Sequence, residues 1–137
     1  MAIREVIFRG KRADSGEWVE GDLLQTRYHS GHIEYQIMPQ TPVSSAVPVL
    51  PETVGQYTGL TDRNGKRIFE GDICKFKRFN DVHIGKVVFN VTTASFIMWY
   101  QPIVGAYGEK ATHKMLLSAC DNIEVIGNIH DGPELLR

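Results

Sequence analysis

The stretch that decides the fold is NGKRIFEGDIC, residues 64–74: a polar turn with Gly, a few larger residues, then Glu70-Gly71-Asp72 and two apolar residues. The same phrase occurs earlier as DSGEWVEGDLL, residues 14–24, with Glu20-Gly21-Asp22. Gly allows positive φ, and Asp or Asn beside it can hydrogen-bond the local backbone. Both copies therefore predict short extended segments joined by Gly hinges, and such a hinge by itself holds no nucleophile, metal cluster or phosphate cradle.

Size and composition place the chain among ordinary soluble domains. Its 137 residues suit one domain, or two very small ones that share an interface. Hydrophobic residues make up 42% and charged residues 23%, so a folded core is expected. The formal net charge of −1 gives no global field toward nucleic acid or an anionic membrane, and any such binding must be local.

The termini and the cysteines indicate a cytoplasmic protein. Residues 1–6, MAIREV, carry charges where a secretory signal needs an apolar core. No stretch approaches the ~20 apolar residues of a membrane span. Cys74 and Cys120 lack CxxC spacing and predict two reduced, buried thiols, with a structural disulfide as the alternative.

The local pattern predicts an all-β, or at least β-rich, fold. Short runs of β-branched and aromatic residues lie between Gly, Asn, Asp and Pro. One short helix is expected over Thr112 to Cys120, where Met115, Leu116 and Ala119 share a face. The predicted strands cover residues 3–8, 18–24, 33–38, 73–79, 86–90, 96–100 and 123–129.

Prolines divide the chain. Four of them fall within residues 39–51, which predicts a crossing segment with a short edge strand near Val47–Val49. Asn64-Gly65 is the strongest hairpin signal. We expect an N-terminal β-rich subdomain over residues 1–58, which includes the crossing, and a second subdomain over 59–137.

The run FIMWY, residues 96–100, does not alternate, so both faces of that strand carry large apolar side chains. One face can fill a barrel, and the other needs a further layer. We therefore expect burial between subdomains or between copies of the chain. The candidate interface residues are Trp18, Phe96, Met98, Tyr100, Leu135 and Leu136.

No constellation for catalysis, metal or cofactor is predicted. Of the five histidines only His29 and His32 are close, and no third ligand completes a site near them. The pairs Glu70 with Asp72 and Asp121 with Glu124 are more simply turn residues. Signatures of nucleophile elbows, phosphate loops and dinucleotide sites are absent from the sequence.

One segment concentrates basic and aromatic side chains, as single-strand nucleic-acid platforms do. Simple alternation along a half-exposed strand, with lysines in solvent and Phe76 in the core, gives the same pattern and is the favoured interpretation. The residues for nucleic-acid contact are Lys75, Lys77, Arg78, Phe79 and Lys86.

Nearly the whole chain resembles the YopX family of phage and prophage proteins. The resemblance lies in residues 8–23, 54–73, 85–89, 123–129 and 133–136, and is most specific in YTGL, residues 57–60, with the NGK and EGDI that follow. It implies a phage or prophage origin, an SH3-like barrel in the C-terminal half and a homo-oligomer. It implies no activity, so no functional residue is transferred. Residues 28–47 and 91–113 show no resemblance to the family, so we expect features specific to this chain to lie there.

The sequence thus favours a cytoplasmic, non-enzymatic binding or assembly module. The alternative is local binding of single-stranded nucleic acid. An enzyme would need a concave pocket with at least two convergent ionisable groups.

Overall fold

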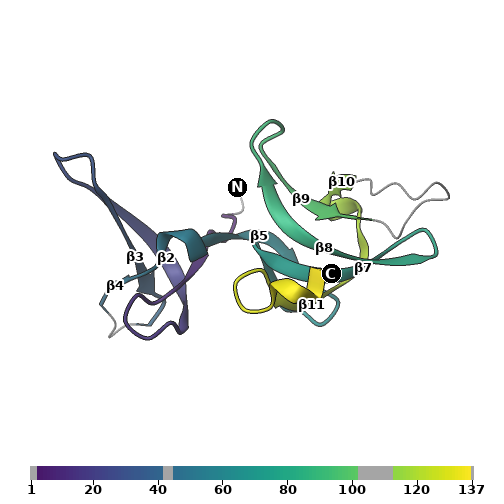
Figure 1. Ribbon diagram of the computed structural model, residues 1–137, viewed down its shortest axis with the longest axis horizontal. Helices are drawn as coiled ribbons and strands as arrows, with labels where there is room; N and C mark the ends of the chain where they lie inside the picture. Colours follow the sequence, from purple (N-terminus) through teal and green to yellow (C-terminus); the bar gives the residue numbers. More distant parts are fainter. Residues whose placement is uncertain (1–2, 42–44, 102–112, 137) are drawn as a thin grey trace. The chain divides into compact units, whose positions relative to one another are not determined.

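The computed structural model describes residues 3–41, 45–101 and 113–136, which form two compact units, Met1–Gly59 and Leu60–Arg137 (Figure 1). The sequence placed this boundary one residue earlier. Apart from short 3₁₀ turns, the described elements are antiparallel strands, so the predicted all-β class is confirmed. None of these turns has the length or apolarity needed to cross a bilayer.

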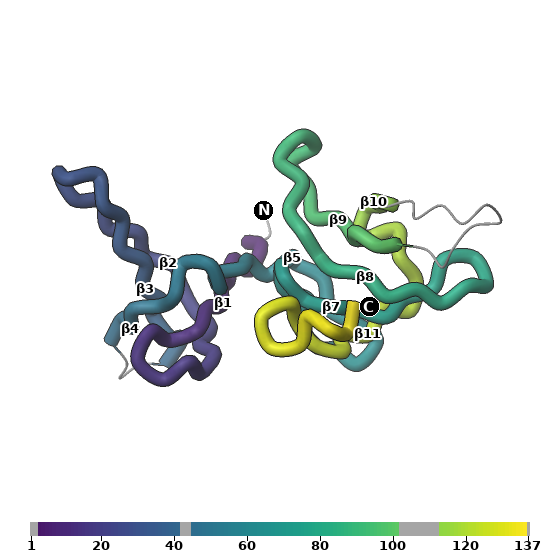
Figure 2. Tube along the Cα trace, viewed as in Figure 1, coloured from purple at the N-terminus to yellow at the C-terminus, as the bar shows by residue number. Residues whose placement is uncertain are grey.

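The first unit is one antiparallel sheet with the strand order β4-β3-β2-β1-β5. Its chain path is drawn from purple to teal in Figure 2. Ile37 and Val49 are buried, and both side chains lie against Gly10, where a Cβ would approach Val49 Cβ to 3.2 Å. The strands are β1 (Phe8–Lys11), β2 (Trp18–Arg27), β3 (Ile33–Pro39), β4 (Val47–Pro48) and β5 (Gly55–Thr61).

The proline-rich crossing contains the expected edge strand. Among the described strands β4 pairs with β3 alone; Pro48 lies opposite Gln36, and Val49 forms a bridge with Arg12. Proline has no amide hydrogen for a ladder, so an edge is where it is tolerated. Residues 42–44 lie outside the described part of the chain.

The two Glu-Gly-Asp phrases differ, and the expectation of a hinge is wrong for the first. Gly71 has φ +93 and separates two strands, with the Asp72 carboxylate accepting the Phe69 amide at 2.7 Å. Gly21 instead lies inside the continuous strand β2. A Cβ there would lie 1.9 Å from the Met38 carbonyl oxygen, so Gly21 permits a close backbone approach.

The second unit is a curled five-stranded sheet with the order β10-β9-β8-β7-β11, together with the short strand β6, which pairs with β5 (Figure 1). It fits the expected SH3-like barrel. Its buried core is formed by Ile68, Cys74, Phe76, Val87, Met98, Tyr100, Leu117, Cys120 and Ile123. The strands are β6 (Arg67–Phe69), β7 (Asp72–Arg78), β8 (Asp81–Asn90), β9 (Ser95–Tyr100), β10 (His113–Leu116) and β11 (Asp121–Asn128).

The predicted helix over residues 112–120 is wrong within the described residues. His113–Leu116 is strand β10, paired with β9, and only Leu117–Ala119 forms a 3₁₀ turn. Met115 lies opposite Met98 and packs against the core, so strand pairing overrides the weak helical pattern. Thr112 lies outside the described residues.

Some of the apolar side chains that the sequence assigned to an interface are already buried inside the barrel unit. Met98 and Tyr100 are 0% and 2% exposed and fill the core. These two side chains therefore face the barrel interior and not a partner, which corrects their assignment to an interface. Phe96 packs at the core margin, edge to face with Phe89 at 5.3 Å.

The other candidate interface residues also have neighbours. Trp18 lies under the guanidinium of Arg9 at 4.8 Å. Leu135 and Leu136 belong to the 3₁₀ turn Pro133–Leu136. The Leu135 side chain packs against Gly127, where an added Cβ would lie only 2.6 Å from Leu135 Cδ1. Both cysteines are free and buried, as predicted.

One buried carboxylate ties the β5–β6 turn to β11. Asp62 Oδ1 accepts the amides of Asn64 and Lys66 at 2.8 and 2.9 Å, and Oδ2 accepts the Val125 amide at 3.0 Å. Burial alone raises the pKa of Asp62, but these three amides outweigh it and hold the pKa below its ordinary value.

We expect Asp62→Ala to lower the free energy of unfolding by about 2 kcal/mol at pH 7, because three amides lose their acceptor. A lowered pKa stabilises the fold above the ordinary value of 3.8, and this contribution disappears as pH falls through the folded value. Urea denaturation should therefore show the difference from wild type shrinking below about pH 4. Asp22→Ala, at an exposed aspartate of β2, is the control and should leave stability unchanged; equal losses in both variants would contradict the assignment.

Candidate functional site

Strand alternation places the predicted basic residues on the outer face of the barrel sheet. Cys74 and Phe76 point into the core, so Lys75 and Lys77 between them point outward and are exposed. In the register of β7 with β8, Lys75 lies opposite Ile84 and Lys77 opposite Val82. The outer face at this end therefore combines ammonium groups with aliphatic side chains.

The β7–β8 hairpin exposes three large apolar side chains within six residues. Phe79 is 86% exposed, Val82 44% and Ile84 41%. We call Phe79, Val82 and Ile84 the hairpin patch. Apolar side chains gathered at one place on a surface are more informative than isolated ones, because such patches mark contact sites.

Phe79 occupies a backbone position that a bulky residue rarely adopts. It begins the two-residue turn between Arg78 and Asp81 with φ +56, the sign that Gly normally supplies at the first position of a type II′ hairpin. The Arg78 guanidinium lies 5.5 Å from its ring centroid. A strained, exposed aromatic residue costs stability and is a feature of functional surfaces.

Arg78 itself is on the other side of the sheet. Its Nη1 donates a 2.6 Å hydrogen bond to the buried Tyr100 hydroxyl, and the Tyr100 ring stacks on His113 with centroids 5.5 Å apart. Of the five residues predicted for nucleic-acid contact, the sheet thus brings Lys75, Lys77 and Lys86 to one face. It places Phe79 at the tip and holds Arg78 on the inner side.

A second basic group on the outer face centres on Trp99. Lys86 Nζ lies 4.6 Å from the Trp99 ring centroid, and Lys114 is opposite Trp99 in the β10–β9 register. Among the described residues, the outward positions of β8, β9 and β10 carry no carboxylate. These positions are Val82, Ile84, Lys86, Val88, Asn90, Ser95, Ile97, Trp99, Lys114 and Leu116, of which Ile97 is buried.

The sequence did not single out Trp99 or Lys114 for this face. Trp99 belonged to an apolar run and Lys114 to an expected helix, so only the strand register brings them together.

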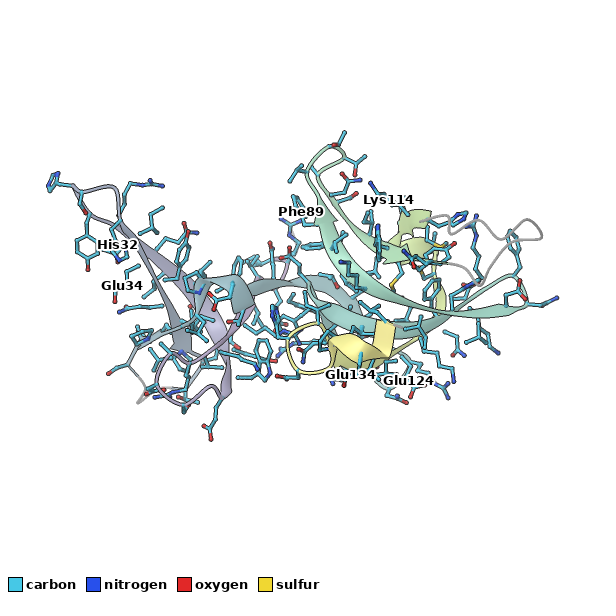
Figure 3. The ribbon with its side chains drawn as sticks, viewed as in Figure 1. His32, Glu34, Phe89, Lys114, Glu124 and Glu134 are labelled. Carbon is cyan, nitrogen blue, oxygen red and sulfur yellow. The ribbon has the colours of Figure 1, made fainter. Side chains whose placement is uncertain are left out.

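Carboxylates on this face belong to β11, at the opposite edge of the sheet from β10. Glu124 lies opposite Lys75, and Asp121 opposite Lys77. Figure 3 labels Lys114 on β10 and Glu124 on β11 at these two separate edges. Lys75 and Lys77 therefore each have a carboxylate opposite them on β11, whereas Lys86 and Lys114 have none opposite them.

A separate open pocket of about 330 Å³ lies beside the β5–β6 turn. Its ionisable lining groups are Asp62, Arg63 and Cys120. Asp62 is bound by three backbone amides, and burial, with the charge of Asp121, raises the pKa of Cys120 to about 11. The Cys120 thiol stays protonated near neutral pH and is a poor nucleophile there.

The histidines do not gather into a metal site within the described residues, which contain no group of three or more His, Cys, Asp or Glu suited to a metal ion. His32 stacks on Tyr28 with centroids 5.8 Å apart, and the Tyr28 hydroxyl donates to Glu34 at 2.8 Å. Figure 3 shows His32 and Glu34 on the β2–β3 hairpin.

Fold and surface together define a small all-β protein with an SH3-like barrel and an exposed apolar and basic sheet face. The chain belongs to the YopX family, whose model, described as YopX protein, matches residues 7–137.

Its fold is similar to the crystal structure of protein EF1440 from Enterococcus faecalis, with a TM-score of 0.55 and 23% identity over 97% of this chain and 99% of that one. A search of curated proteins gives no match.

We expect Phe79→Gly to raise the free energy of unfolding by about 1 kcal/mol, because glycine relieves the positive-φ strain while little apolar burial is lost. Phe79→Ala keeps the Cβ and therefore most of the strain, so it serves as the control and should leave stability near wild type. Chemical denaturation measures both. A Phe79→Gly protein no more stable than Phe79→Ala would show that the turn is not strained.

Proposed function

We propose that this protein is a phage- or prophage-encoded binding and assembly module of the host-cell cytoplasm. In this proposal it has no catalytic activity of its own and joins copies of itself through the hairpin patch. The observation that carries the proposal is the exposure of Phe79, Val82 and Ile84 together on one hairpin. An isolated chain gains nothing from keeping an exposed aromatic side chain in a strained turn.

Two further properties support self-association. The formal net charge of −1 leaves little repulsion between copies of the chain. The hairpin patch is also bordered by Lys75 and Lys77, so a polar rim surrounds an apolar centre, as in transient protein interfaces.

The absence of catalysis is proposed from the ionisable groups of the 330 Å³ pocket. Both Asp62 oxygens accept backbone amides, and the Cys120 thiol is protonated near neutral pH.

Light-scattering mass tests the assembly. We expect wild type to have at least twice the 15.4 kDa of one chain, and Ile84→Lys to shift the mass toward one chain because a charge enters the patch. Leu24→Lys is the matched control: Leu24 is also 41% exposed but lies in the first unit, outside the patch. A wild-type mass of one chain at every concentration, or equal dissociation in the control, would refute the proposal.

A second candidate function is binding of single-stranded nucleic acid, favoured by the Lys86–Trp99–Lys114 row. Phosphates pair with lysine, and bases stack on aromatic rings without a sequence requirement. The outward positions of β8 to β10 have no carboxylate among the described residues, so local repulsion of a phosphate backbone is small there.

This candidate predicts salt-dependent retention of the protein on single-stranded DNA or RNA. We expect Lys86→Glu with Lys114→Glu to abolish retention. The control reverses two exposed arginines of the first unit, Arg4→Glu with Arg27→Glu, and makes the same change in net charge. Retention that both double variants lose equally would indicate a general charge effect, and absence of retention of wild type at low salt would remove the candidate.

A further inference from the structure

A small pocket on the outer face borders the hairpin patch, with which it shares Val82, and lies where β11 is irregular. β11 pairs with β7 at Asp121–Lys77 and at Glu124–Lys75, and the register shifts between these pairs. Asn122 in the irregular segment has φ +52. The pocket has a volume of about 50 Å³ and is lined by β7, by β11, by Val82 of β8 and by Arg63 of the β5–β6 turn.

The position of Arg63 is fixed by its backbone. Its amide donates to the Ile123 carbonyl at 2.8 Å, which attaches the turn to the bulged part of β11. The preceding residue, Asp62, holds the same turn through three amides. Three segments distant in sequence therefore meet at the pocket, and the main-chain hydrogen bonds preorganise it.

The charge of the pocket suits an anion. Three cationic side chains line it, Arg63, Lys75 and Lys77, against one carboxylate, Glu124. Arg63 Nη1 lies 3.7 Å from Glu124 Oε2, and these side chains are 50% and 39% exposed, so this ion pair is weak. Among the described residues, neither lysine has a carboxylate within 4.0 Å of its ammonium group.

The volume of the pocket and the type of its hydrogen-bond donors limit which ligands it can bind. A volume of about 50 Å³ holds a few water molecules, which is room for one phosphate group and too little for a nucleoside. Arginine can bind an oxyanion with two parallel N–H donors, lysine adds point charges, and the Asn122 amide can donate as well.

We propose that this pocket binds a phosphate group. Arg63, Lys75 and Lys77 supply the positive charge, and Glu124 weakens the site by competing for Arg63. The group can be free inorganic phosphate or belong to a nucleotide or nucleic-acid backbone. The site is complete within one barrel unit and so does not require self-association, but Lys75, Lys77 and Val82 also form or border the hairpin patch, so self-association through that patch would compete with phosphate.

The test is a titration of ¹⁵N-labelled protein with inorganic phosphate at constant ionic strength, with chloride as the reference anion. We expect saturable shifts of the amides of residues 122–125 and 75–77. Lys75→Gln with Lys77→Gln should weaken binding by about tenfold or more. Glu124→Gln should tighten it about threefold, the effect of removing one unit charge at roughly 6 Å in a water-like dielectric.

Arg4→Gln with Arg27→Gln, at two exposed arginines of the first unit, removes the same number of charges, is the matched control and should bind phosphate as wild type does. Equal shifts with chloride, equal loss in the control, or no tightening in Glu124→Gln would overturn the proposal. Parallel titrations with a nucleoside 5′-monophosphate and with a short single-stranded oligonucleotide identify the source. Tighter binding of either, abolished by the same double substitution, assigns the pocket to that ligand, and a preference for inorganic phosphate assigns it to the free ion.

Discussion

The barrel unit depends on one buried carboxylate. Asp62 accepts amides from Asn64 and Lys66 within its own turn and from Val125 in β11, so a local turn and a distant strand share one acceptor. A charged oxygen makes these bonds stronger than neutral ones, and the lowered pKa of Asp62 expresses the same preference for the ionised form. The turn is thereby fixed against β11. Arg63 extends from this fixed turn to the irregular part of β11, so the geometry of a surface site follows from a hydrogen-bond network beneath it.

Much of the architecture could be predicted from local chemistry. Asn64-Gly65 marks a turn because Gly65 takes φ +79, and Pro48 belongs to an edge strand because it lacks an amide hydrogen. Gly21 could not be separated from Gly71 in this way. The two occur in the same three-residue phrase, but Gly71 provides a positive φ while Gly21 gives space to the Met38 carbonyl of the next strand. The difference lies in a neighbour that is not adjacent in sequence.

The surface was predicted less completely, for the same reason. Lys75 and Lys77 could be assigned to the outer face by alternation alone, since Phe76 between them belongs in the core. Trp99 and Lys114 join that face through the pairing of β9 with β10, and the helical spacing of Met115 concealed that strand. Arg63 and Asn122 required the β11 irregularity. Alternation reveals which side of a strand a residue occupies, whereas only register reveals its neighbours.

The two thiols of this chain have a practical consequence. Cys74 and Cys120 are both buried, and the high pKa of Cys120 keeps it in the unreactive protonated form near neutral pH. Maleimide and disulfide reagents attack accessible thiolates. A cysteine introduced on an exposed strand position would therefore react first in the folded protein, and fluorescent or spin labels can be attached selectively without removing either native cysteine.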